Sequence, residues 1–325
     1  MIWLDKPKIT LDDQAAVNRA LYRGHISTHT PPVAEFEKAI ADYIGVDASQ
    51  VVATCSGTAA LHLALIDALD RKINIIDIPA LSFAATRNVA KYWRFNLPRI
   101  SPVRSDTFLF DFEHGITGEH AIIHVHLYGN VSAVPATKAK VIIDAAESFG
   151  APLPAGSWDY ICYSFNRNKT ITCGGGGAIV CKGSTERIRK LIRPGACEDE
   201  PAYNYGMLGQ CAALGLSQLQ RIGELLAQRK HFAEIYRNEL PVTFQAIADH
   251  HTHWFTVALF ESAEARERIE AVLTANGIEH RRVFKPFVPG GVAQDIYDRG
   301  LCLPVSAWNT EGDIRTVCKV IRRHV

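Results

Sequence analysis

The chain has 325 residues, of which 47% are hydrophobic, so it is long enough for one large domain with a smaller companion and a sizeable core. Its 35 lysines and arginines nearly cancel its 34 aspartates and glutamates, and the net charge of +1 favours neither nucleic acid nor an anionic membrane as a partner. The N-terminus lacks the features of a signal peptide, and no apolar run approaches the roughly 18 residues of a membrane span. We therefore expect a cytoplasmic protein.

Strand and helix patterns alternate through the first 182 residues, which indicates an α/β fold with a largely parallel sheet and helices on both faces. Some links between the later strands are short, so we expect the last strands to pair antiparallel. Helices are expected at residues 12–24, 31–46, 59–69 and 83–93, and strands at 51–53, 73–79, 121–129, 140–146, 159–165 and 178–182.

Helical periodicity dominates after residue 182. Residues 207–240 predict a long, bent helical spine, interrupted by glycines, that connects two domains. A strand at 254–260 and helices at 262–278 and 310–325 then predict a small α+β domain. We place the large domain at residues 1–235 and the small domain at 236–325.

A turn rich in hydroxyl side chains lies between the strand at 51–53 and the helix that follows it. Its sequence, Thr54-Cys55-Ser56-Gly57-Thr58, suits a phosphate cradle, because the free amides and the positive end of the helix dipole face an anion. An ordinary helix N-cap by Ser56 or Thr58 explains the same residues.

The sharpest chemical signal is Lys169, which is followed five residues later by four consecutive glycines, Gly174 to Gly177. Each glycine weakens a regular element by roughly 0.5–1 kcal/mol relative to alanine, so the backbone here needs room. Upstream, Asp144 ends a buried strand, the position at which α/β proteins bind ligands. Together these residues indicate a site for pyridoxal phosphate (PLP), with a lysine for its aldehyde and an acid for its pyridinium nitrogen.

Histidines and cysteines give no convincing metal site. His124 and His126 lie on one face of a strand, and a second group precedes Trp254, but neither pattern supplies a third ligand. We therefore expect structural or surface histidines and no metal. Eight cysteines form no Cys-x-x-Cys pair, and we expect reduced thiols at Cys55, Cys162, Cys173, Cys181, Cys197, Cys211, Cys302 and Cys318.

Eight stretches in order make the chain resemble the DegT/DnrJ/EryC1/StrS family of PLP-dependent sugar aminotransferases nearly end to end. They are PPVAEFEKAIADYIG, SGTAALHLAL, PALSFAAT, HVHLYG, IIDAAESFGA, YSFNRNKTITCGGGGAIV, NYGMLGQCAALGLSQL and RGLCLP. The resemblance implies the aspartate aminotransferase-like fold (fold type I), with a large, mostly parallel mixed sheet and a smaller α+β C-terminal domain.

The resemblance also implies the roles of site residues. Lys169 would form the covalent bond to PLP, and Asp144 would pair with the pyridinium nitrogen. The phosphate would be held by Gly57, Thr58 and Ser164 and, from a neighbouring subunit, by Asn204, which implies a homodimer with shared active sites. Phe83 would stack on the ring, and Glu147 would lie near its other face and its O3′.

The stretches DAAESFGA and SFNRNKTITCGGGG are similar to the corresponding stretches of one branch of the family. Enzymes of this branch aminate C4 of nucleotide-linked 4-keto-6-deoxy sugars, and glutamate is the expected donor. A same-fold enzyme that dehydrates a sugar or aminates a non-nucleotide ketone is an alternative, although family dehydratases replace the lysine. A second alternative is a non-catalytic relative that binds PLP or a sugar nucleotide.

Some positions depart from the family pattern. Gly206 stands where arginine is common and Thr30 where glycine is common, and the links at 68–76, 102–111 and 133–140 look shortened. These departures leave the cofactor positions intact but put contacts with the sugar nucleotide in doubt.

Overall fold

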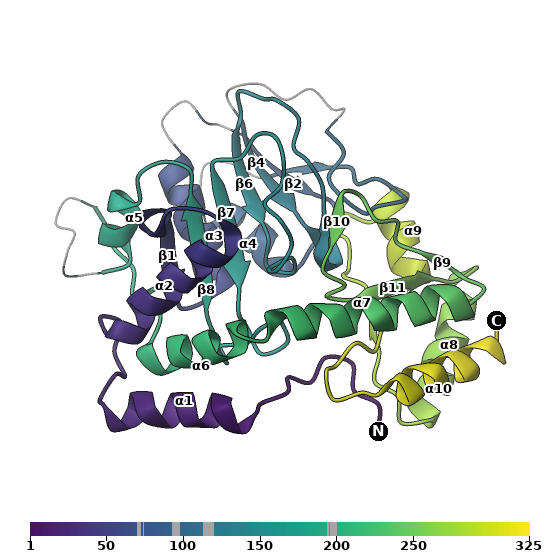
Figure 1. Cartoon of the computed structure of the whole chain (residues 1–325). Helices are drawn as coiled ribbons and strands as arrows, with labels where there is room; N and C mark the ends of the chain where they lie inside the picture. Colours follow the sequence, from purple (N-terminus) through teal and green to yellow (C-terminus); the bar gives the residue numbers. More distant parts are fainter. Residues whose placement is uncertain (70–72, 74, 93–97, 113–119, 194, 196–199) are drawn as a thin grey trace.

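The computed structural model describes residues 1–69, 73, 75–92, 98–112, 120–193, 195 and 200–325, so the expected thiol of Cys197 and part of the 68–76 link lie outside the described residues. Strands and helices alternate up to residue 191, as the hydrophobic pattern predicts (Figure 1). The helices of this part are α1 (Leu11–Tyr22), α2 (Pro31–Ile44), α3 (Gly57–Ala68), α4 (Ala84–Lys91) and α5 (Glu186–Leu191), with 3-10 turns η1 (Ala48–Gln50) and η2 (Leu127–Gly129).

A seven-stranded mixed sheet in the order β1-β8-β7-β6-β4-β2-β3 forms the centre of the described chain. The strands from β7 to β3 run parallel, whereas β8 pairs antiparallel with both β7 and β1, so both expectations about strand direction are confirmed. The strands are β1 (Val51–Thr54), β2 (Ile75–Pro79), β3 (Arg99–Ser101), β4 (His120–Val125), β6 (Lys140–Asp144), β7 (Tyr160–Ser164) and β8 (Gly177–Cys181).

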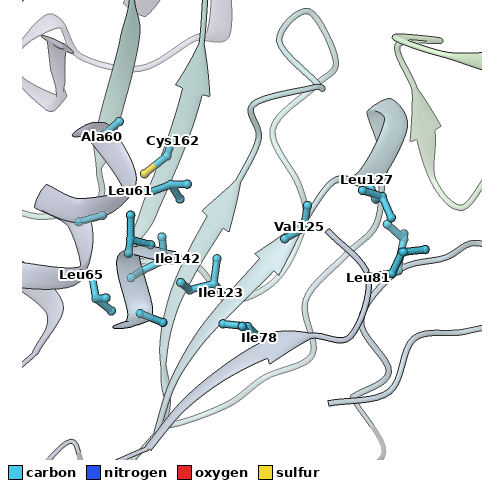
Figure 2. Packing of buried hydrophobic residues seen from close by; sticks show 14 of the residues in the cluster. Ala60, Leu61, Leu65, Ile78, Leu81, Ile123, Val125, Leu127, Ile142 and Cys162 are labelled. Carbon is cyan, nitrogen blue, oxygen red and sulfur yellow. The ribbon is translucent and has the colours of Figure 1, made fainter. Parts of the chain in front are cut away.

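Each face of this sheet has its own apolar core, because successive strand residues point to opposite sides. On one face, Ile142 belongs to the cluster that contains Leu61 and Leu65 of α3 (Figure 2). On the other face, the adjacent Ile143 packs in a cluster with Phe36 of α2. The predicted arrangement of helices on both faces is therefore confirmed, and it holds the carboxyl ends of the parallel strands in a fixed frame.

The helical stretch predicted over 207–240 forms two helices, α6 (Gly209–Leu219) and α7 (Ile222–Glu239). The break lies at Arg221, where φ is −117°, and not at a glycine. Arg221 Nη2 donates to Asp13 Oδ2 and to the backbone oxygen of Lys8, each at 2.7 Å. A contact with the N-terminal segment therefore accompanies the break, and no local sequence signal marks it.

A four-stranded antiparallel sheet in the order β12-β13-β11-β9 follows α7, with α10 packed against α7 and α8 (Figure 1). The predicted strand at 254–260 and helices at 262–278 and 310–325 are confirmed as β11, α8 and α10. The predicted domain boundary at residue 235 falls within α7, and the division stays a prediction. The elements are β9 (Thr243–Phe244), β11 (Thr256–Leu259), α8 (Ala263–Ala275), β12 (Arg281–Arg282), α9 (Gly291–Arg299), β13 (Gly300–Leu303) and α10 (Glu311–Arg322), while β5 (Asn130–Val131) and β10 (His250–His251) form a separate pair.

Candidate active site

A cavity of about 250 Å³ lies where the parallel strands β6 and β7 end. Ligands of α/β proteins bind at this edge of the sheet. Seven of the eight predicted site residues line the cavity, although they come from five separate parts of the chain. These residues are Gly57, Thr58, Phe83, Asp144, Glu147, Ser164 and Lys169.

Lys169 projects from the connection between β7 and β8 and is largely buried. Its Nζ lies 3.7 Å from Glu147 Oε1 and 4.0 Å from the centroid of the Trp254 ring. Burial lowers the pKa of Lys169, while the charges of Glu147 and Asp144 oppose that change and Arg281 adds to it. The site therefore favours a neutral amine at lower pH than a lysine in water would allow.

Asp144 ends β6 and accepts two hydrogen bonds. Thr86 Oγ1 donates to its Oδ2 at 2.8 Å, and the amide of Ala146 donates to its Oδ1 at 3.2 Å. Because the single hydroxyl proton of Thr86 is used on this carboxylate, the 2.8 Å contact between Ser82 and Thr86 has Ser82 as its donor. Burial raises the pKa of Asp144, and the hydrogen bond from Thr86 is the largest opposing effect.

Glu147 faces Lys169 with Oε1 and is held through its other carboxylate oxygen. Its Oε2 accepts a 2.7 Å hydrogen bond from the amide of Tyr128, a residue with a left-handed φ of 61°. Burial raises the pKa of Glu147, and the charge of Lys169 is the largest opposing cause. Two buried carboxylates thus flank one buried amine.

The N-terminus of α3 forms part of the cavity wall. Ser56 Oγ accepts from the amide of Ala59 at 3.1 Å, so the N-cap interpretation of this turn is confirmed. The amides of Gly57 and Thr58 make no hydrogen bond with the described residues and, at the positive end of the helix dipole, are available to an anion. A Cβ at Gly57 would lie 2.7 Å from Ser164 Cβ, so only glycine lets the helix reach the end of β7.

Two of the predicted site residues, Phe83 and Asn204, are exposed, unlike the other six. Phe83 lines the cavity but is 55% exposed, and its ring lies 5.5 Å from that of Phe284. Asn204 does not line the cavity of this subunit and is exposed. A Cβ at the nearby Gly206 would lie 2.8 Å from Thr28 Cγ2, so the arginine common there would not fit without a shift.

Sequence reasoning missed the wall built by the C-terminal third of the chain. Trp254, Arg281 and Phe284 line the cavity, and Trp254 Nε1 donates to the backbone oxygen of Asn168 at 2.8 Å. Thr86 was also missed as a partner of Asp144. Only Thr86 carried a signal, since it lies in the PALSFAAT stretch; the others have no local pattern.

The described histidines and cysteines do not line this cavity. His124 and His126 are buried with ring centroids 5.4 Å apart, and the part of the chain that the structure describes holds no group of three His, Cys, Asp or Glu side chains suited to a metal. The seven described cysteines are free thiols, although Cys55 is exposed and Cys211 half-buried. No described helix is long and apolar enough to cross a membrane.

These residues fit PLP. The α3 terminus offers free amides and a glycine for a phosphate, the end of β7 adds the Ser164 hydroxyl, and Asp144 offers a carboxylate for a ring nitrogen. Lys169 supplies a buried amine in the same cavity. The donor set thus matches the three polar parts of the cofactor.

The chain as a whole is similar to known proteins. A family model, the DegT/DnrJ/EryC1/StrS aminotransferase family, matches residues 7–322. The chain is 29% identical to the GDP-perosamine synthase of Escherichia coli O157:H7, over 97% of this chain and 96% of that protein. It is 33% identical to the GDP-perosamine synthase of Caulobacter vibrioides, over 88% of each.

A solved structure shows the same fold. The Spr1654 protein of Streptococcus pneumoniae, in its PMP form, superposes with a TM-score of 0.87 at 21% identity, over 99% of this chain and 98% of that one. The large mixed sheet is thus that of the PLP-dependent aminotransferases, as predicted. The chain belongs to the DegT/DnrJ/EryC1/StrS aminotransferase family and is a PLP-dependent sugar aminotransferase.

Proposed function

We propose that the enzyme transfers an amino group from glutamate to the C4 keto group of a nucleotide-linked 4-keto-6-deoxy sugar. The observation that carries this proposal is a buried lysine beside two carboxylates, Asp144 and Glu147, in a cavity that also opens onto the free amides of α3. The similarity to two proteins named GDP-perosamine synthase supports a nucleotide-sugar substrate. The cytoplasmic location stays a prediction.

Different residues would bind different parts of PLP. Gly57, Thr58 and Ser164 would bind its phosphate, and Asp144 would face the ring nitrogen, whose positive charge would favour the ionised carboxylate against the effect of burial. Phe83 would cover one face of the ring. Glu147 would lie near the other face and the ring hydroxyl.

PLP, when bound, supplies an aldehyde for amines and a ring that withdraws electrons from the substrate carbon. Lys169 Nζ would hold the cofactor and, once displaced by the donor amine, would take the proton from the substrate carbon. Its lowered pKa makes the neutral amine available for that step. In the second half of the reaction the same nitrogen would return a proton.

A homodimer with shared active sites is part of this proposal. Asn204 is exposed on its own subunit and does not line that subunit's cavity, as a residue that serves the neighbouring site requires. We expect Lys169→Ala and Asn204→Ala to be deficient alone and to regain activity when mixed and refolded together, because a mixed dimer has one intact site. Absence of any recovery would contradict a shared site.

The function is tested with glutamate and a panel of GDP-, UDP- and dTDP-linked 4-keto sugars. Wild-type protein should lose the visible band of bound PLP on addition of glutamate and produce an amino sugar with one member of the panel. Lys169→Ala should slow the amine transfer by about 10²- to 10⁴-fold, the range of positioned acid–base groups. The control Lys182→Ala, at an exposed position directly after β8, should behave as wild type.

A further inference from the structure

The N-terminal segment of the chain reaches the immediate neighbour of the active-site lysine. Asp5 is buried, with 9% of its surface exposed, and its Oδ2 accepts a 2.9 Å hydrogen bond from the side-chain nitrogen of Asn168. Asn168 directly precedes Lys169 in the sequence. A carboxylate that lies outside the 250 Å³ cavity is thus bonded to the residue next to the reacting amine.

Hydrogen bonds to the backbone on both sides of Asp5 fix its position. The backbone oxygen of Leu4 accepts from the amide of Val305 at 2.8 Å. The backbone oxygen of Lys6 accepts from Ser306 Oγ, also at 2.8 Å. The carboxylate of Asp5 is therefore an anchor of fixed position.

Asn168 is held a second time, by Trp254. The indole Nε1 donates to the backbone oxygen of Asn168 at 2.8 Å, and the ring centroid of Trp254 lies 4.0 Å from Lys169 Nζ. Both the side chain and the backbone of Asn168 are therefore bonded. The indole that fixes this backbone also faces the amine of Lys169.

A buried arginine links Trp254 back to Asp5. Arg229 is 8% exposed, and its Nη1 donates to the backbone oxygen of Trp254 at 2.7 Å. Burial lowers the pKa of Arg229 to about 10, and the charge of Asp5 opposes that change. Three hydrogen bonds and one attraction between charges thus join Asp5, Asn168, Trp254 and Arg229 into what we call the Asp5 network.

The Asp5 network restricts the position of Lys169, because hydrogen bonds in a medium of low dielectric are strong and mutually supporting. Removal of the carboxylate would leave the Asn168 donor without its acceptor and the charge of Arg229 without its counter-charge. An amine that moves a proton must lie within hydrogen-bond reach of the reacting atom. A displacement of about 1 Å can slow such a step by about 100-fold.

Resting on the proposed role of Lys169 in amine transfer, we propose that Asp5 is a positioning residue that orients Lys169 through Asn168. Asp5 acts by its hydrogen bond to Asn168 and contacts no reacting atom. The test therefore measures the position of the Lys169 amine as well as the reaction.

The accessibility of Lys169 is measured on full-length protein freed of PLP, as its rate of acetylation by acetic anhydride relative to the exposed Lys182. Asp5→Ala should raise this ratio by about tenfold, because loss of a hydrogen bond to a charged group shifts a local opening equilibrium by about that factor. Asp5→Asn keeps an acceptor oxygen and should fall between Asp5→Ala and wild type. Lys6→Ala, whose side chain contacts the Trp3 and Trp308 rings, should remain within about twofold of wild type.

Asn168→Ala supplies a second measurement, because removal of either partner breaks the same hydrogen bond. The acetylation ratio of the double variant Asp5→Ala/Asn168→Ala should match that of the more affected single variant. Effects that multiply in the double variant would show that Asp5 does not act through Asn168 and would overturn the proposal. An unchanged ratio in Asp5→Ala would overturn it as well.

Alkylation of Cys162, which is fully buried in β7, separates a local effect from loss of the fold. Its rate in Asp5→Ala should equal that of wild type. A parallel rise in Cys162 alkylation and Lys169 acetylation would assign Asp5 to stability alone, against the proposal.

The PLP-loaded enzyme gives the last measurement. In Asp5→Ala, kcat should fall by about 10- to 100-fold while KM for both substrates stays within about twofold, as expected when the reacting amine is misplaced. An unchanged kcat would contradict the positioning role. Failure of the proposed function would appear instead as full activity of Lys169→Ala, whatever acetylation ratio Asp5→Ala gives.

Discussion

Three groups oppose the effect of burial on Asp144: the hydroxyl of Thr86, the amide of Ala146 and the charge of Lys169. The first of these is part of an ordered chain in which Ser82 donates to Thr86 and Thr86 donates to the carboxylate. An aspartate that is to face a ring nitrogen must be ionised and correctly turned. The two hydroxyls contribute to both requirements.

Thr86→Val keeps the shape of this buried side chain and removes its hydroxyl. We expect the pKa of Asp144 to rise, because the hydrogen bond from Thr86 favours the ionised carboxylate and its loss leaves the effect of burial less opposed. The acid limb of the kcat profile should therefore move to higher pH, and PLP should bind more weakly. Steady-state rates between pH 5 and 9 and equilibrium dialysis of PLP measure these effects.

Ser82→Ala serves as the graded control, because it leaves the bond between Thr86 and Asp144 in place. Its profile should move less than that of Thr86→Val. Equal behaviour of Thr86→Val and wild type in both measurements would show that the hydroxyl does not support the carboxylate.

At the scale of elements, β8 and α3 approach one another through glycine. A Cβ at Gly177 would lie 2.6 Å from the amide nitrogen of Gly57 and from the carbonyl group of Ser56. These are backbone atoms, which cannot rotate away. The last glycine of the run at 174–177 is therefore a packing residue that holds the N-terminus of α3 against the sheet.

Gly177→Ala should push β8 and α3 apart and lower the free energy of unfolding by about 1–3 kcal/mol, the usual cost of overpacking. PLP affinity should fall with it. The control Gly183→Ala, where no atom lies within 4 Å of the added Cβ, should change stability by less than about 0.5 kcal/mol. Urea unfolding of apoprotein tests both, and matching midpoints for the two variants would contradict the packing role.

Elements with a strong local pattern could be predicted from the sequence. The apolar run that ends at Asp144 reads as a buried strand, and the turn before α3 carries the expected capping serine. The break at Arg221 could not be found, because no local pattern marks it and the contact that accompanies it is with Asp13, a residue far away along the chain. Trp254 and Arg281 could not be predicted as cavity residues either, because only tertiary packing brings them to the cavity.

For the whole molecule, two pairs of histidines that are buried or, at His251, half-buried predict sensitivity to acid. Burial lowers the pKa of His124 to about 4 and that of His126 well below its usual value, and the stacked pair of His251 and His253 behaves in the same way. Their ordinary value in an unfolded chain is about 6.5. The folded state thus keeps neutral rings that the unfolded state would protonate.

This difference in pKa sets the direction in which stability changes with pH. The contribution to stability is fully present above about pH 6.5 and is lost as the pH falls toward 4, at up to about 1.4 kcal/mol per pH unit for each histidine. His124→Gln should therefore lose less stability than wild type between pH 7 and 4.5. Urea unfolding at a series of pH values measures this, with His324→Gln at the exposed C-terminus as the control. Parallel loss in all three proteins would exclude the histidine as a cause.

The hydrogen bonds around Asn168 also bear on how fast the protein folds. Its side chain donates to Asp5, 163 positions away, and its backbone oxygen accepts from Trp254, 86 positions away. Such distant partners raise the contact order, which slows folding. During synthesis, Lys169 leaves the ribosome well before Trp254 and Arg281 exist. A nascent or truncated chain that ends before Trp254 thus carries the Lys169 amine without the wall that Trp254, Arg281 and Phe284 form around it.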